Sequence, residues 1–209
     1  MIAAFLGLRL YSVLGRRAEH EEEPVPTRFD PVDASAPRAA LPQPRYAQPV
    51  RPEGLEGVLP AVERGVREIA VADRRFDIAG FVDGAKAAYG MVLEAFWSGD
   101  RETLRELCDN DVYAGFDTAI TARDAAGETL ENRLVRIDDA KIDAAELVGK
   151  TARVTVRFVA DIAAVTRDKD GTVVAGSLDD AIETRDLWTF KRDVREADPH
   201  CLLDETDEG

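Results

Sequence analysis

Proline is confined to one part of this sequence, and that confinement limits where a folded domain can form. Nine of the ten prolines fall between Pro24 and Pro60. This stretch also holds too few large apolar residues to offset the conformational entropy lost on ordering. We therefore expect residues 18–60 to form a disordered linker, acidic at first and then rich in Pro and Ala, and residues 61–206 to form one folded domain.

The first 17 residues are unusually apolar and have a basic end. Residues 1–8 carry no charge, and Arg16 and Arg17 follow shortly after. As a helix, these eight residues would be about 12 Å long, far less than a hydrocarbon core of about 30 Å. We expect a membrane anchor whose contacts are made by Ile2, Phe5, Leu6, Leu8, Leu10, Arg16 and Arg17.

Four interpretations of this segment remain open. It is the inner end of a spanning helix whose first turns lie upstream of a wrongly chosen start codon, an interfacial amphipathic anchor, a signal peptide or a frayed helix, in that order of preference. In the first two, Arg16 and Arg17 flank the segment on the linker side. The positive-inside rule then places the rest of the chain in the cytoplasm.

The first part of the folded domain shows helical periodicity. Apolar residues at intervals of three and four predict helices over 61–72 and 78–98. Asp100 is suited to cap a short helix, and Asp109 or Asn110 to cap a longer one. We therefore expect three or four helices before any strand.

The second part alternates with the period of two that strands require. Alternation predicts strands over 134–138 and 151–158, and Asp170-Gly171 is a typical hairpin turn before a returning strand over 182–193. A last short strand is expected at 201–204. Helices followed by long antiparallel strands predict an α+β fold, in which the N-terminal helices pack on a curved antiparallel sheet.

Charge and motif content exclude several classes of function. The formal net charge is −14, so binding to nucleic acid is not expected. The sequence has no Walker, dinucleotide-binding, HExxH, nucleophile-elbow or CxxC pattern, and Cys108 and Cys201 lie far apart. We therefore expect no metal site and no cofactor.

The titratable residues give little support for catalysis. His20 and His200 lie beside the acidic run and near the C-terminus, where surface positions are expected. The chain has 41 acidic residues, so chance pairs of carboxylates are common, including any formed among Asp161, Asp179, Asp180 and Asp186. We expect no catalytic residue and no enzymatic activity.

Several segments resemble the Tim44-like family, in its alphaproteobacterial membrane-anchored branch. The resemblance covers about two thirds of the chain and rests on residues 72–116, 137–145, 152–166, the strand Asp186-Leu187-Trp188-Thr189-Phe190, Asp198-Pro199 and the N-terminal RLYSVLGRR. Two features depart from the family pattern. The anchor is shorter, and His200-Cys201 replaces an Asn-Trp pair, which removes an aromatic contact for the last strand.

The resemblance implies a cone related to the nuclear-transport-factor-like fold, with a large apolar pocket for an acyl chain or an extended peptide. The pocket candidates are Phe81, Ala85, Tyr89, Phe96, Phe158 and Trp188. It also implies a membrane-tethered adaptor in the bacterial inner membrane, with its domain facing the cytoplasm. The expected partner is a chaperone, a translocase or an assembly client, with membrane lipid as a second one. The alternative is a small-molecule-binding protein or enzyme of the same fold.

Overall fold

The computed structural model describes residues 60–198 and 200–209. The expected anchor and the expected linker lie outside these residues, except for Pro60, which begins the first described helix and does not end the linker. Within the described residues, four helices precede four strands: α2 (Pro60–Ala72), α3 (Ile78–Ser98), α4 (Arg101–Leu107), α5 (Asn110–Ala126), β1 (Thr129–Val148), β2 (Thr151–Arg167), β3 (Val173–Asp193) and β4 (Leu202–Glu208). The predicted α+β class is confirmed. Within this part of the chain, no helix is both long and apolar enough to cross a membrane.

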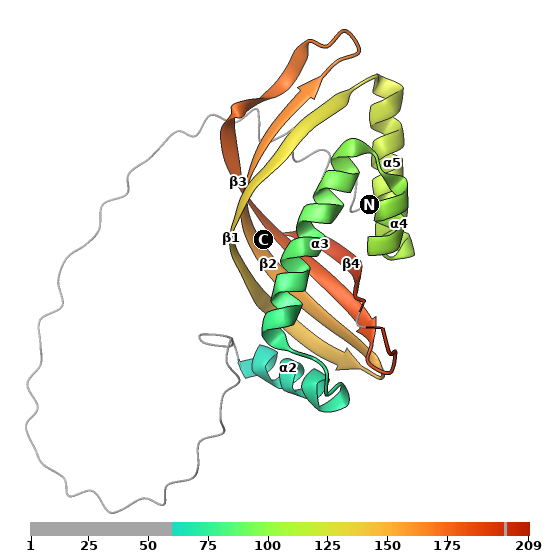
Figure 1. The fold of residues 1–209 in the computed structure, drawn as a ribbon, viewed down its shortest axis with the longest axis vertical. Helices are drawn as coiled ribbons and strands as arrows, with labels where there is room; N and C mark the ends of the chain where they lie inside the picture. The colour runs from blue at the N-terminus through green and yellow to red at the C-terminus, as the bar shows by residue number, and fades with distance from the viewer. Residues whose placement is uncertain (1–59, 199) are drawn as a thin grey trace, which may run out of the picture.

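The helices begin and end at residues with capping chemistry. The Asp100 carboxylate accepts hydrogen bonds from the first backbone N–H groups of α4, and Asp109 does the same for α5, as predicted. Gly99 ends α3 with a φ of 78°, a left-handed conformation that glycine adopts without steric cost. Because α3, α4 and α5 follow one another with such short connections, they form a continuous helical layer (Figure 1).

The sheet is antiparallel throughout, in the order β1-β2-β3-β4. Its first three strands are longer than the alternating pattern predicts, since β1 spans 20 residues and β3 spans 21. Register shifts interrupt the pairing of β1 with β2, for example between Leu134 and Arg136 and between Ile142 and Ala144. Each shift breaks the period of two, which hid the full length of β1 from the sequence pattern.

Two groups of buried side chains hold the layers together. In the larger group, Tyr89 of α3 stacks on Phe158 with ring centroids 4.4 Å apart and lies 4.6 Å from the Trp188 ring. The smaller group packs α2 against one end of β1 and β2 through residues such as Val66 and Ile69. Figure 1 shows α2 at that end of the sheet and α3 crossing its concave face.

The last strand docks although position 201 carries Cys201 and not the Trp that the resemblance led us to expect. Leu203 is fully buried, and its carbonyl accepts a hydrogen bond from the backbone N–H of Asp109. The Lys191 ammonium lies 2.8 Å from the Asp109 carboxylate and 2.5 Å from that of Asp204. Apolar burial and this ion-pair network therefore fix β4 beside β3, and β4 extends to Glu208, beyond the predicted 201–204.

Candidate functional site

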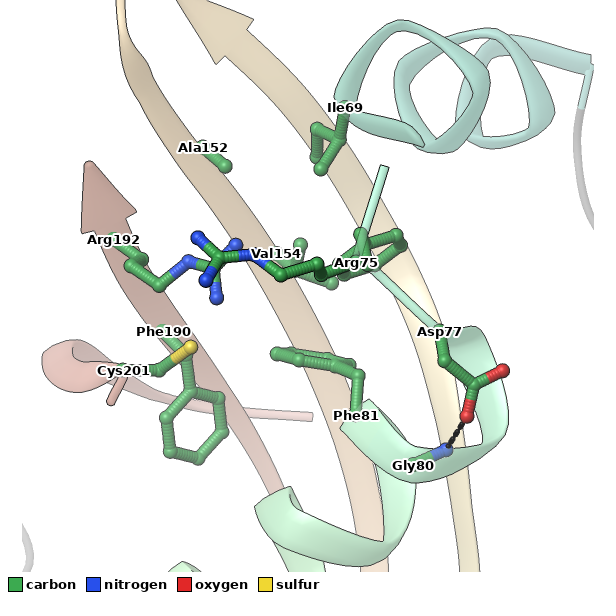
Figure 2. Close-up of a pocket in the computed structure, with 11 residues that line it drawn as sticks. Ile69, Arg75, Asp77, Gly80, Phe81, Ala152, Val154, Phe190, Arg192 and Cys201 are labelled. Atoms are coloured by element: carbon green, nitrogen blue, oxygen red, sulfur yellow. Dashed lines mark hydrogen bonds between the residues drawn. The ribbon is translucent and has the colours of Figure 1, made fainter. Parts of the chain in front are cut away.

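A pocket of about 220 Å³ opens between the α2–α3 connection, the start of α3 and the strands β2 and β3 (Figure 2). Most of its surface is apolar, contributed by Ile69, Phe76, Phe81, Ala152, Val154 and Phe190. The rest of the wall consists of two arginines, Arg75 and Arg192, the thiol of Cys201, and Asp77 with Gly80 at the start of α3. The site therefore offers an apolar interior that the two cationic side chains cross from opposite sides (Figure 2).

The turn between α2 and α3 places the aromatic residues of the pocket. The backbone N–H of Asp73 donates to the Ile69 carbonyl at the end of α2, and Asp77 caps α3 by accepting from Gly80 N–H at 2.6 Å. This short turn brings the ring of Phe76 within 5.7 Å of Phe81. Phe81 in turn meets Phe190 of β3 edge to face, at 6.2 Å and 84°. Three rings from three elements form one wall.

The arginines connect the pocket to the loops that surround it. Arg192 is 10 % exposed and forms an ion pair with Asp73, which is 3 % exposed. Arg75 donates to the backbone carbonyls of Glu196 at 2.9 Å and Ala197 at 3.0 Å. Arg75 therefore ties the α2–α3 connection to the segment between β3 and β4, and Figure 2 shows both arginines reaching across the pocket.

The cysteine in the pocket wall behaves as an apolar residue. Burial raises the pKa of the Cys201 thiol, and the nearby positive charge of Arg192 opposes this effect only in part. Because a thiol is a weak nucleophile until it loses its proton, Cys201 contributes surface and not reactivity. Cys108 lies elsewhere in the core, where burial and then the charge of Asp109 raise its pKa to about 12.

The six pocket candidates from the sequence divide into two groups. Phe81 lines the pocket. The other five are buried in the larger core group and are absent from the pocket wall: Ala85, Tyr89, Phe96, Phe158 and Trp188. Of the predicted surface histidines, His200 is exposed and bonds through its ring nitrogen to the Glu106 carbonyl, whereas His20 lies outside the described residues.

A buried polar pair in the core was missed by the sequence reasoning. The Tyr89 hydroxyl donates to the Asp186 carboxylate at 2.8 Å, and both residues are buried. Asp186 has the same strand parity as the inward-facing Trp188 and Phe190, so alternation alone could have located it. Neither Tyr89 nor Asp186 lines the pocket, and their contact joins α3 to β3. The pocket residues Arg75 and Arg192 had no comparable local signal.

The helices pack on a curved antiparallel sheet, and an apolar pocket lies where α2 and α3 meet that sheet. This arrangement defines a class of α+β domain built around a cavity. A model of the Tim44-like domain matches residues 62–208. The chain therefore belongs to the Tim44-like domain family.

Curated relatives are mitochondrial proteins. The chain is 28 % identical over 116 residues to the mitochondrial import inner membrane translocase subunit TIM44 of Homo sapiens, covering 54 % of this chain and 26 % of that one. It is 23 % identical over 126 residues to subunit TIM44-1 of Arabidopsis thaliana, covering 60 % and 27 %. The matched part thus spans about a quarter of the length of these relatives.

A solved structure resembles the domain more loosely. The intermembrane space region of the chloroplast protein ARC6 aligns with a TM-score of 0.45 and 12 % identity. The alignment covers 64 % of this chain and 97 % of that one.

Proposed function

We propose that this protein is a membrane-tethered adaptor that holds a protein partner, acting in protein translocation or in membrane-protein assembly. The family assignment and the translocase subunits among its relatives support this proposal. The partner is a chaperone, a translocase subunit or an assembly client, and membrane lipid is a second ligand. We place the chain in the membrane-anchored branch of alphaproteobacteria, at the inner membrane, with the domain facing the cytoplasm.

The observation that carries the proposal is the size and lining of the pocket. Sites for small molecules commonly have volumes of about 300–1,000 Å³. This pocket holds about 220 Å³ and has walls formed by Phe76, Phe81 and Phe190. That space suits one apolar side chain of a partner better than a whole metabolite. A single anchor residue in an aromatic pocket is a common source of binding energy at protein interfaces.

The arginines add a reason to favour a polypeptide. Arg75 is exposed, with 61 % of its side chain accessible, and it lies at the pocket wall. A peptide that inserts an apolar side chain also brings backbone carbonyls, which accept hydrogen bonds from guanidinium groups. Cys201 remains a protonated thiol, so the wall supplies surface for recognition.

The N-terminal segments fit the same role. Residues 1–17 would attach the chain to the membrane, and residues 18–60 would let the domain reach partners near the surface. Tethering raises the local concentration of a binding module, to the order of mM for short linkers and less for long ones. A weak pocket contact then suffices for function.

The test of this proposal is a substitution that fills the pocket with a larger side chain. Trp at position 201 would place an indole ring in the cavity that Cys201 now lines, whereas Cys201→Ser keeps the size of the side chain. A photo-crosslinking residue at position 76 reports on the pocket. One at position 71, near the end of α2, serves as a control, because Val71 is 77 % exposed and is absent from the wall. Crosslinking is done in native membranes with the full chain.

We expect position 76 to crosslink a discrete protein, Cys201→Trp to abolish that product and Cys201→Ser to retain it. Equal products from positions 71 and 76 would contradict a pocket contact. A small metabolite that copurifies with the domain and is displaced by Cys201→Trp would replace the adaptor with the small-molecule alternative.

A further inference from the structure

The strand β3 is covered by β4 along only part of its length. Pairing with β4 involves β3 residues from Asp186 to Lys191, although β3 begins at Val173. In residues 60–198 and 200–209, no other strand pairs with this side of β3. Figure 1 shows this part of β3 at the margin of the sheet, on the side away from α4 and α5.

The backbone at this margin points outward with regular spacing. The Gly209 N–H donates to the Arg185 carbonyl at 3.1 Å, so the peptide groups of Arg185 face the side that β4 occupies. Alternate residues of a strand present their N–H and C=O groups to the same side. Glu183 and Ala181 therefore face this side as well. Residues 181–184 pair with β2 without a register shift and precede Arg185, whose carbonyl is bonded to Gly209, and we call residues 181–184 the open edge.

Acidic side chains surround the open edge. Above it, the pairing with β2 shifts between Ala181 and Ser177, so residues 178–180 bulge from the ladder. Asp179 and Asp180 of this bulge are exposed, as is Asp207 at the end of β4. Glu183 adds a fourth carboxylate, 2.9 Å from the guanidinium of Arg185. The surroundings are therefore predominantly negative.

The two faces of the open edge differ in character. Asp186 and Trp188 turn their side chains into the core, so Ile182 faces the same concave side and is half-buried there. Glu183 has the opposite parity and faces the convex side. A strand added here would place one set of side chains beside Ile182 and the alternate set beside Glu183.

We propose that the open edge accepts an extended segment of a partner protein in which apolar residues alternate with Lys or Arg. The segment would pair with β3 as an added strand, beginning where the pairing of β3 with β4 ends at Asp186. In this mode of recognition, backbone hydrogen bonds give the affinity. The carboxylates select a cationic strand and repel a second copy of this edge. This inference uses no pocket residue and does not depend on the proposed function.

The test measures binding of a short fluorescent peptide of alternating Lys and Val to the full chain by fluorescence anisotropy. Two control peptides separate the causes of binding. One carries N-methyl groups on the amides that would face the edge, which keeps the charge and removes the donors. The other has Glu for Lys. We expect each change to weaken binding by about tenfold or more.

Variants of one residue give a matched comparison. Glu183→Pro removes the outward N–H, at a position where the bonds to β2 do not use that group, and Glu183→Gln removes only the charge. We expect Glu183→Pro to weaken binding by about tenfold and Glu183→Gln by only a few-fold. Thermal unfolding checks that the Glu183→Pro variant is folded. The double variant Asp179→Lys with Asp180→Lys tests the contribution of the negative charge without altering the backbone of the edge.

Binding of the N-methylated peptide as tight as that of its parent would overturn the proposal, since charge alone would then explain it. So would unchanged binding to folded Glu183→Pro, or no measurable binding of the Lys-Val peptide to the full chain. The pocket variant Cys201→Trp should bind this peptide as the wild type does, so failure here is distinct from failure of the pocket hypothesis.

Discussion

The packing of α2 on the sheet predicts opposite effects for the same substitution at two helical glycines. Replacing Gly by Ala inside an exposed helix stabilises it by about 1 kcal/mol, because Ala loses less conformational entropy on folding. Gly65 lies within α2 and Gly84 within α3, so helix propensity alone predicts that both variants gain stability.

The structure reverses the sign at Gly65. A Cβ atom there would overlap the backbone carbonyl of Ala145 in β1, whereas a Cβ at Gly84 meets nothing within 4 Å. A backbone carbonyl cannot rotate aside, so α2 must shift and loosen the packing of Val66 and Ile69, which are 1 % and 0 % exposed. Overpacking of this kind costs about 1–3 kcal/mol, which exceeds the gain in propensity.

We therefore expect Gly65→Ala to lower the free energy of unfolding by up to about 2 kcal/mol and Gly84→Ala to raise it by about 0.5–1 kcal/mol. Urea unfolding followed by circular dichroism measures both midpoints, and equal slopes would confirm that stability alone has changed. A stabilised Gly65→Ala variant would refute the close approach of α2 to β1. A destabilised Gly84→Ala variant would refute the exposed setting of Gly84.

Two further predictions concern the ion pairs at β4 and the N-terminal segment. The hydrogen bonds that the Lys191 ammonium donates to Asp109 and then to Asp204 raise the pKa of Lys191 above 10.5. The stabilising effect of Lys191 is therefore complete below pH 10.5 and is lost as pH rises through the higher folded value. Burial alone would raise the pKa of Asp109, but the hydrogen bonds donated by Lys191 and by the Val112 N–H outweigh burial and hold the pKa below 3.8. The stabilising contribution of Asp109 is therefore present above pH 3.8 and is lost as pH falls through the lower folded value. Lys191→Met should reduce the fall of the urea midpoint at both low and high pH. If both falls were unchanged, this ion-pair network would not be the cause of the pH dependence of stability. Deleting residues 1–17 should move the protein from the membrane pellet to the supernatant, whereas an unchanged pellet fraction would place the membrane affinity in the folded domain.

Local sequence patterns predicted the helices and most of their boundaries. Asp100 was correctly identified as a cap, and Asp109 was one of two candidates with Asn110 for the next helix, because capping depends on a side chain and the N–H groups two or three residues later. The hairpin turn was correct for the same reason, since Gly171 has a φ of 79° and few other residues adopt that value. The interactions that fix these features lie within a few residues, so the sequence alone contains them.

Register, bulges and the pocket depend on contacts between distant residues. The shift between Leu134 and Arg136 reflects how β1 fits β2, and no local pattern encodes it. Arg75 lines the pocket by bonding to Glu196, a residue 121 positions away. Aromatic spacing on α3 correctly indicated an apolar face, but burial of Tyr89 and Phe96 in the core followed from the depth at which α3 packs on the sheet. The sequence by itself determined which residues are apolar and where helices begin. Only the tertiary structure decided which of those residues fill the core and which leave a cavity, because a cavity is the space that packed elements fail to fill.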